Sequence, residues 1–320
     1  MAETGGYTGR RPAVSVVMNC LNGEKYLREV IDSVCAQTFK DWEIIFWDNA
    51  SADGSAAIAR SYGEKLKYFR SETTFLLGKA RNLAFAEAAG EYIAILDCDD
   101  IWLPDKLEKQ IGLFGRNPSL GFTFSNSLFF NDGGDEFPMF SAVTPHRGFS
   151  FRELFLKNFI STETMIFRRS ALESLDHLFD EDFTMVMDYD LTLRLAWRYE
   201  IDFVEEPLSK WRMHPGSESN RKRFLIPHET LSMLEKLIRD IPEMESRYGP
   251  EIRIFRKGLS YEFALEEWFR GNRRAARTHL RPHVRDLKFF LTLLLTFVLS
   301  YQNYERMKPL LRAAFRMGNR

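Results

Sequence analysis

Three carboxylates follow a short apolar stretch of the sequence. The run Ile93–Leu96 has no helical period, which is typical of a strand buried on both faces. Asp97, Asp99 and Asp100 come next, where such a strand would end. Ligands bind at the carboxyl ends of strands in open α/β sheets, and crowded carboxylates repel one another unless a cation lies between them. The cluster therefore predicts a site for Mg²⁺ or Mn²⁺ with a phosphate-bearing substrate. The alternative is an acidic turn that caps a helix beginning near Pro104.

The sequence before this cluster alternates between strand and helix patterns. Val14–Met18 and Trp42–Trp47 are further apolar strands, and Leu66–Phe69 is a weaker one. An amphipathic helix with Asn22 as its N-cap and a helix over about 55–62 separate them. This alternation predicts an α/β fold with a doubly wound, mostly parallel sheet flanked by helices. A dinucleotide-binding Rossmann enzyme and a P-loop ATPase are disfavoured, because neither Gly-rich phosphate motif occurs.

A series of motifs continues along the chain to about residue 220. In order, they are VSVVMNCLNG at 14–23, SVCAQTF at 33–39, WDNASADGS at 47–55, GKARN at 78–82, LDCDDIWLP at 96–104, MDYDLTLR at 187–194 and WRMHPGS at 211–217. This set resembles the family 2 inverting glycosyltransferases, which have the GT-A fold. The resemblance implies a metal-dependent enzyme that moves a sugar from a nucleotide diphosphate sugar to a hydroxyl of a glycan or lipid-linked acceptor by a single displacement.

The resemblance also implies a metal site. Asp99 matches the direct ligand of Mg²⁺ or Mn²⁺, Asp97 a residue that supports the metal or the ribose, and His214 a position that contacts the metal or the diphosphate in relatives. Negative charge grows on the leaving diphosphate, and a metal stabilises it as a Lewis acid. Neutral imidazole suits Mn²⁺ better than Mg²⁺. A lone histidine without such a match is more often structural.

A second requirement is a base that takes the proton of the attacking hydroxyl. By the resemblance, Asp188 matches the family's base. The family motif has an acid before the base, and Met187 replaces it here, which should make Asp188 easier to ionise. Asp190 precedes an apolar helical pattern and is expected either to support the site or to act as the N-cap of that helix. Capping at a helix start is the alternative for both aspartates.

Donor recognition departs most from the family pattern. Leu21 stands where relatives often have an aromatic residue, and Asn49 where they have an aspartate that reads the base edge. An asparagine amide still pairs with the N3–H and carbonyl edge of uracil or thymine, so UDP or dTDP is expected rather than GDP. Lys79 and Arg81 are candidate phosphate or base contacts, with solvated surface as the alternative. The expected donor-binding residues are Asn19, Leu21, Asp48, Asn49, Lys79, Arg81 and Asp97.

The acceptor side is less defined. In this family the region Phe122–Thr164 should form part of the acceptor wall. Its phenylalanines offer sugar-stacking surface, but aromatics at roughly helical spacing are more often core; they are Phe149, Phe151, Phe155 and Phe159. The residues assigned to the acceptor or to support of the site are Asp100, Trp102, Asp190 and Arg212.

Composition predicts a catalytic domain with an appendage. The chain has 320 residues, which exceeds a usual single domain, and 45% of them are hydrophobic. Three cysteines do not make a disulfide framework, and the N-terminus lacks the apolar region of a signal peptide, so a cytoplasmic enzyme is expected. The expected divisions are a flexible N-terminus at 1–11, a GT-A nucleotide-sugar-binding and catalytic domain at 12–220, and a helical, basic C-terminal appendage at 221–320.

The C-terminal segment carries an unusual charge. Residues 268–320 include twelve basic and two acidic side chains, a net charge of +10, whereas the whole chain is at −1 and the remainder therefore at −11. Within it, Phe289–Leu299 is apolar except for two threonines and is shorter than the roughly 20 residues of a spanning helix. It is either a buried helix of a packed appendage or an interfacial segment that docks on anionic lipid, which would place the enzyme peripherally on the inner face of the membrane.

Two rival classes share parts of this pattern. One is a catalytically silent nucleotide-sugar-binding module, against which the presence of Asp99, Asp188 and His214 argues. The other is a nucleotidyltransferase, which would normally carry a Gly-rich basic loop after its first strand. Asn19–Glu24 is not such a loop. The expected partners are a nucleotide-sugar donor, a glycan or lipid-linked acceptor and an anionic membrane surface, with no nucleic acid.

Overall fold

The computed structural model describes residues 11–307, which form two compact units divided between Arg223 and Phe224. The predicted flexible N-terminus, 1–11, lies outside the described residues except for Arg11. So do four basic residues of the C-terminal segment, Lys308, Arg312, Arg316 and Arg320.

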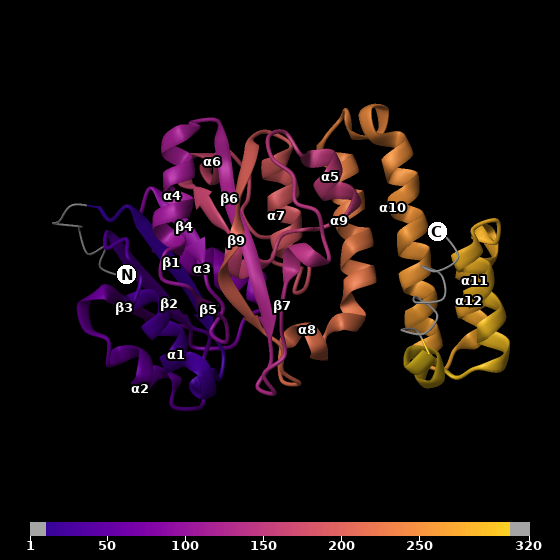
Figure 1. Ribbon diagram of the computed structural model, residues 1–320, viewed down its shortest axis with the longest axis horizontal. Coiled ribbons are helices and arrows are strands. Elements are labelled where there is room, and N and C mark those ends of the chain that lie inside the picture. The colour runs from indigo at the N-terminus through magenta and orange to yellow at the C-terminus, as the bar shows by residue number, and fades with distance from the viewer. Residues whose placement is uncertain (1–10, 308–320) are drawn as a thin grey trace. The chain divides into compact units, whose positions relative to one another are not determined.

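One mixed sheet organises the first unit (Figure 1). Its strand order is β3-β2-β1-β4-β8-β6-β9-β5, with β7 beside β6. The first four strands are mutually parallel, β8 is antiparallel to both neighbours, and β6 runs parallel to β9. The strands are β1 (Val14–Cys20), β2 (Trp42–Asp48), β3 (Leu66–Arg70), β4 (Tyr92–Ile95), β5 (Ile101–Trp102), β6 (Leu120–Phe130), β7 (Glu136–Pro138), β8 (Ile166–Arg168) and β9 (Glu200–Arg212). The expected mostly parallel α/β sheet is confirmed.

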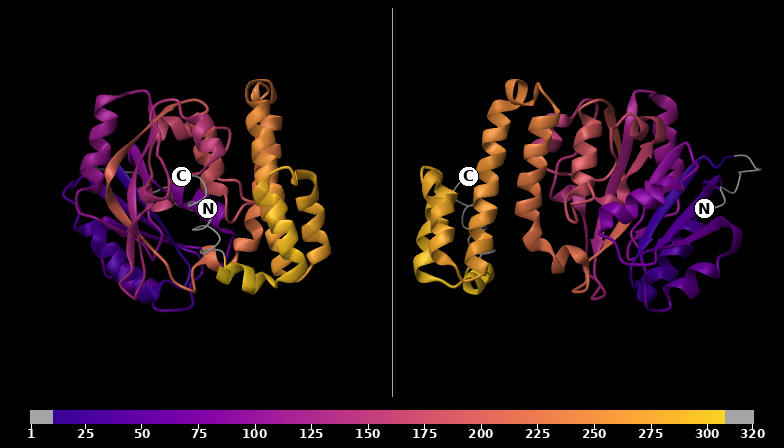
Figure 2. Two further views of the ribbon diagram at one scale, coloured as in Figure 1. Left: turned by 45° about the vertical axis from the view of Figure 1, so that its right-hand side comes forward. Right: turned by 180° about the vertical axis from the view of Figure 1, so that it is seen from behind.

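Helices flank this sheet, as Figure 2 shows from two further sides. Their apolar faces and the sheet form a core in which the side chains of β1 are buried along the whole strand. The helices are α1 (Glu24–Cys35), α2 (Ser55–Arg60), α3 (Leu77–Ala86), α4 (Lys106–Arg116), α5 (Phe151–Leu156), α6 (Arg169–Glu173), α7 (Met187–Ala196) and α8 (Glu218–Arg221). A short 3-10 turn, η3 (Thr162–Thr164), precedes β8.

The predicted N-cap of α1 is wrong. Asn22 has a positive φ of 56°, and its Oδ1 accepts a hydrogen bond from the backbone of Ala52 at 2.8 Å instead of from α1. The starts of α1 and α2 stabilise each other. Asp53 accepts from the N–H of Glu24 at 3.0 Å, and Glu24 accepts from the N–H of Gly54 at 2.9 Å. Long-range partners thus replace the local cap that the sequence suggested.

The second unit is helical. It contains α9 (Ile226–Asp240), α10 (Met244–Phe269), α11 (Arg273–Leu280) and α12 (Leu287–Val298). Helix α10 runs beside α11 and α12 in Figures 1 and 2, and the three bury a core of aromatic and aliphatic side chains that includes Tyr261, Trp268 and Phe289. Within residues 11–307, no helix has both the length and the apolar character needed to cross a bilayer.

The turn before β4 yields a stability prediction. A Cβ added to Gly90 would lie 2.5 Å from the backbone nitrogen of Ser15, whereas one added to Gly112 in α4 would meet nothing within 4 Å. Gly90→Ala should therefore lower the free energy of unfolding by about 1–3 kcal/mol, because backbone must move. Gly112→Ala should raise it by up to about 1 kcal/mol. Urea unfolding midpoints measure both, and an unchanged midpoint for Gly90→Ala would contradict the close approach.

Candidate functional site

The candidate site lies where three parallel strands end together. In the sheet register, Val17 of β1 pairs with Ile95 of β4, and Cys20 pairs with Asp48 of β2. The loops that follow these strands therefore open at the same edge of the sheet. This edge holds the three clustered aspartates and most of the expected donor-binding residues.

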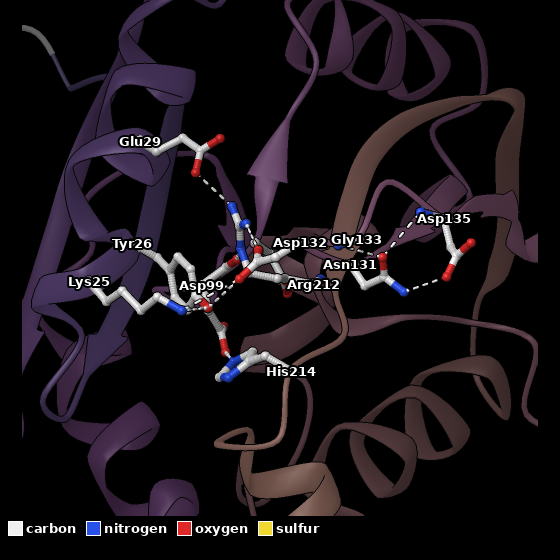
Figure 3. A network of polar contacts seen from close by, with 11 residues as sticks. Lys25, Tyr26, Glu29, Asp99, Asn131, Asp132, Gly133, Asp135, Arg212 and His214 are labelled. Carbon is white, nitrogen blue, oxygen red and sulfur yellow. Dashed lines mark hydrogen bonds and ion pairs between the residues drawn. The ribbon is translucent and has the colours of Figure 1, made fainter.

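A carboxylate and an imidazole face each other at this edge. His214 Nε2 lies 3.0 Å from Asp99 Oδ2, and the ring of Tyr26 meets the histidine ring edge-on at 5.2 Å (Figure 3). Burial and the negative charge of Asp97 raise the pKa of Asp99, and the histidine opposes this shift. The carboxylates at this edge therefore favour a positive charge beside them.

Arg212 fixes this pair in place (Figure 3). Its backbone N–H donates to Asp100 Oδ1 at 2.9 Å, and its Nε donates to the carbonyl of Asp99 at 2.9 Å. The two terminal nitrogens reach Glu29 at 2.6 Å and Asp132 at 3.2 Å. One guanidinium thus joins β9, the Asp99 loop, α1 and the loop after β6. His214 lies two residues beyond it, so the clamp also places the histidine.

The alternative of an acidic helix-capping turn is wrong. Helix α4 begins at Lys106 after Asp105, and strand β5 separates it from the aspartates. In the described chain the three carboxylates do not bond to α4. Asp99 faces His214, Asp100 accepts from the Arg212 backbone, and Asp97 accepts from Arg81 Nη2 at 2.8 Å.

A buried polar cluster lies behind the aspartates. Burial first, and then the charge of Glu163, raise the pKa of Asp100 well above its ordinary value. Trp102 is enclosed and donates from Nε1 to the carbonyl of Glu163 at 2.9 Å. Lys106 donates to the carbonyl of Thr164 at 2.8 Å, and burial lowers its pKa to about 7. These contacts attach η3 to the loop that carries Asp99.

The same turn reaches the expected base. Thr162 donates its hydroxyl to Asp188 Oδ2, and Asp188 Oδ1 accepts from the N–H of Tyr189 at 2.9 Å. Asp190 is not an N-cap, because α7 already begins at Met187 and the Asp190 carboxylate pairs with Arg194 at 2.8 Å. In the described chain no direct contact joins Asp188 to Asp99 or His214; the connection runs through η3.

Asp48 is enclosed by its own chain. Its oxygens accept from Tyr68 and Arg70 at 2.5 Å each and from the N–H of Ser51 at 2.7 Å. Burial alone would raise the pKa of Asp48, but these hydrogen bonds and the arginine charge outweigh it and hold the pKa below its ordinary value. Asp48 supports the wall of the site and presents no open oxygen to a ligand.

Asn49, which is expected to read a base edge, has backbone partners in this structure. Its Nδ2 donates to the carbonyl of Phe75 at 2.9 Å, and its Oδ1 accepts from the Phe75 N–H at 3.0 Å. Both polar atoms of the Asn49 side chain therefore have a partner within the chain. Leu21 remains 43% exposed and can still offer an apolar face.

Two other expected donor residues carry buried polar atoms that no described residue satisfies. Asn19 lacks a partner for both side-chain atoms, and Arg81 lacks one for Nε and Nη1. A buried polar atom without a partner costs about 1–3 kcal/mol, so these groups are suited to a ligand. Lys79 is partly exposed, and its Nζ lies 3.9 Å from Glu181 Oε2.

The aromatic acceptor surface is largely core. Phe151, Phe155 and Phe159 are buried, and the first two stack on each other with ring centroids 5.7 Å apart. Only Phe149 of the four is exposed, at 71%. The helical spacing of Phe151 and Phe155 places both on the buried face of α5.

The donor set fits a divalent cation held with a substrate. No group of three or more His, Cys, Asp or Glu side chains within residues 11–307 is arranged to hold a metal alone. Mg²⁺ is commonly bound by one or two carboxylates, with substrate phosphates and water supplying the rest. The 3.0 Å between His214 Nε2 and Asp99 Oδ2 equals the spacing of adjacent octahedral ligands at about 2.1 Å from a metal.

Several residues of the site were not anticipated from the sequence. Arg70 ends the third parallel strand, so its place at a strand end is a sequence signal of the same kind as that of the aspartates. Thr162 and Glu163 lie in a turn without periodicity, and Tyr26 lies on the amphipathic helix α1. No sequence signal pointed to a site role for these three.

Comparisons with known proteins agree with this geometry. The family model described as Glycosyl transferase family 2 matches residues 15–176. A Methanocaldococcus jannaschii protein described as an uncharacterized glycosyltransferase is 36% identical over 225 residues, covering 67% of this chain and 74% of that protein. The putative teichuronic acid biosynthesis glycosyltransferase TuaG of Bacillus subtilis is 37% identical over 130 residues, 39% of this chain and 51% of that protein.

Solved structures share the fold. S. aureus TarS 1–349 has a TM-score of 0.60 at 20% identity, covering 94% of this chain and 91% of that chain. The mannosyltransferase PcManGT of Pyrobaculum calidifontis, in complex with GDP-Man and Mn²⁺, has a TM-score of 0.61 at 20% identity, covering 95% and 86%. The chain therefore belongs to glycosyl transferase family 2 and is a glycosyltransferase with the GT-A fold.

Proposed function

We propose that the enzyme is a metal-dependent inverting glycosyltransferase that uses UDP- or dTDP-sugar and a lipid-linked or glycan hydroxyl acceptor. The observation that carries this proposal is the Asp99–His214 pair, 3.0 Å apart at the carboxyl edge of the parallel strands and fixed by Arg212. Family membership makes sugar transfer the activity. The pair adds a place for a cation beside the leaving diphosphate.

The metal-binding residues in this proposal are Asp99 and His214. Mn²⁺ or Mg²⁺ held there would offset the charge that develops on the diphosphate as the sugar leaves. Arg212 orients the Asp99 loop. Arg81 is bonded to Asp97, and we assign its two unsatisfied nitrogens to contact with the donor. Mn²⁺ is favoured over Mg²⁺ by the imidazole ligand.

Asp188 is the base in this proposal. An inverting displacement needs an acceptor for the hydroxyl proton as the new bond forms, and Asp188 lies in the first turn of α7 with one oxygen held by Thr162. The threonine hydroxyl fixes the carboxylate in one orientation. Asp190, paired with Arg194, positions the same turn and takes no proton.

The donor proposal keeps a pyrimidine nucleotide but changes its contacts. TarS 1–349 has been solved with UDP and with UDP-GlcNAc, and PcManGT with GDP-Man, so the fold accommodates both base classes. Here the exposed Leu21 offers a ring-facing surface, and Asn19 supplies an unsatisfied amide. We assign base or ribose contact to Asn19 in place of Asn49.

The acceptor proposal rests on the charge of the C-terminal segment. A net +10 over residues 268–320, on a chain at −1, suits a surface of anionic lipid. An enzyme held there would meet an acceptor anchored in the inner leaflet. Peripheral attachment to the inner face of the membrane is accordingly part of the proposed function.

The metal assignment predicts the effect of one substitution. Asp99→Asn should abolish transfer and weaken UDP binding in Mn²⁺, because a neutral amide is a poor ligand for the cation, while thermal stability stays close to that of the wild type. Asp176→Asn, on an exposed aspartate, is the matched control. Full transfer in EDTA would disprove the metal dependence.

The base assignment predicts a graded pair of variants. Asp188→Asn should lower kcat by about 10²–10⁴ with donor KM little changed. Thr162→Val should lower kcat by roughly 10–100-fold, because a hydrogen bond to a charged group is lost, and Thr162→Ser should restore most of it. Steady-state kinetics with saturating donor separates these effects. A larger loss from Asp190→Asn than from Asp188→Asn would reverse the two roles.

The donor assignment predicts a thermal-shift pattern. With Mn²⁺ present, a UDP- or dTDP-sugar at a hundredfold excess over Kd should add about 2.7 kcal/mol of stability. Asn19→Ala should reduce the shift, whereas Lys79→Ala should leave it unchanged because Lys79 lies on the surface. A larger shift with a GDP-sugar would overturn the pyrimidine assignment.

A further inference from the structure

Helix α12 has two threonines beside Phe289 on its inner face and an apolar outer face. Thr292 and Thr296 are buried, and both are held by partners in the second unit. Tyr261 OH lies 3.1 Å from Thr292 Oγ1, and Arg277 donates to the hydroxyl and to the carbonyl of Thr296 at 3.0 Å each. Water-soluble helices normally expose charged and polar side chains on the face that α12 leaves apolar.

The outer face is a continuous apolar stripe. Five of its side chains are between 42% and 74% exposed, and they follow one another at helical spacing: Leu287, Phe290, Leu294, Phe297 and Val298. Lys288 is the one other exposed residue of α12. We call these five residues the α12 stripe. Twelve residues of helix make it about 18 Å long, suited to lying along a surface.

Exposed basic side chains surround the α12 stripe in the sequence. Arg281 and Arg285 precede it, Lys288 lies at its start, and Arg306 follows it; all four are exposed. The nearby acids are engaged within the unit. Asp286 pairs with Lys257 at 2.6 Å, and Glu305 accepts from Tyr301 at 2.9 Å.

We propose that the α12 stripe is the surface by which the protein docks on an anionic lipid bilayer, with the apolar side chains in the acyl boundary and the arginines and lysine at the headgroups. The inference deepens the proposed function and rests on it for its purpose, because a lipid-linked acceptor gives the enzyme a reason to lie on a membrane. A bilayer accepts an apolar stripe that offers no hydrogen-bonding group.

A second copy of the chain is a poorer occupant of this face. Each copy would bring the same basic residues to the interface, and like charges brought together disfavour association. An acidic protein would neutralise the basic side chains. Protein interfaces, however, normally include hydrogen-bonding groups among their apolar ones, and the five residues of the α12 stripe offer no hydrogen-bonding side chain.

Vesicle co-sedimentation of the full chain tests the proposal. With vesicles of phosphatidylcholine containing phosphatidylglycerol, binding at low salt should exceed binding to pure phosphatidylcholine and should fall at high salt. The double variant Leu294→Gln/Phe297→Gln should bind anionic vesicles at least about tenfold more weakly. Ile254→Gln, on an equally exposed apolar residue of α10, is the matched control and should bind as the wild type does.

The next three results would count against the proposal. Full-length protein that stays in the supernatant at low salt overturns it, as does a double variant that still binds fully. A concentration-dependent dimer lost in the double variant, seen by analytical ultracentrifugation, would assign the face to a second copy. UDP binding with Mn²⁺, measured by thermal shift in the same variants, tests the proposed function separately and should be unchanged.

Discussion

The contacts of Arg212 are the constraint on which the candidate site depends. Strand β9 is long, and its last residues pair in continuous register with β6, as far as Arg212 opposite Phe130. The guanidinium fixes that end by reaching the Asp99 carbonyl, Glu29 and Asp132. A planar group with donors on several sides can hold three segments at once, whereas a lysine ammonium acts as a single point charge. The position of His214 follows from this clamp.

The clamp also explains which carboxylates of the cluster stay open to a ligand. Asp97 is bonded to Arg81, and Asp100 is bonded to the Arg212 backbone and enclosed. Asp99 has only His214 as a side-chain partner among the described residues. Crowded carboxylates are tolerated when each is bonded or neutralised. The chain thus satisfies two of the three internally and leaves the third to an imidazole that also binds metals.

Sequence reasoning succeeded where one local pattern determines the structure. The apolar runs before Asp48 and Asp97 fixed the strands β2 and β4, and parallel strands must end at one edge. It is less informative where a distant backbone group competes for a side chain. Asn49 bonds to Phe75, and Asn22 bonds to Ala52. An asparagine side chain suits either the expected role or a bond to distant backbone. Only the contacts of the folded chain decide which of the two it takes.

The base region shows a second limit of the same kind. Both Asp188 and Asp190 were candidates for capping a helix start, but α7 begins at Met187, before either of them. Asp190 lies one turn before Arg194 and pairs with it across that turn. Asp188 lies in the first turn and meets Thr162, whose turn is anchored by Lys106 through Thr164. The orientation of the proposed base therefore depends on buried contacts far from it in the sequence.

The C-terminal helices show why composition alone left two alternatives. Phe289–Leu299 was expected to be either packed or interfacial, and helix α12, Leu287–Val298, combines both properties. Tyr261 and Arg277 present polar groups inside the second unit, and burying them requires hydrogen-bond partners. Threonines on the inner face of α12 meet that need. The α12 stripe is left on the outer face of the same helix. The helix that packs this unit is therefore also the one that exposes an apolar surface.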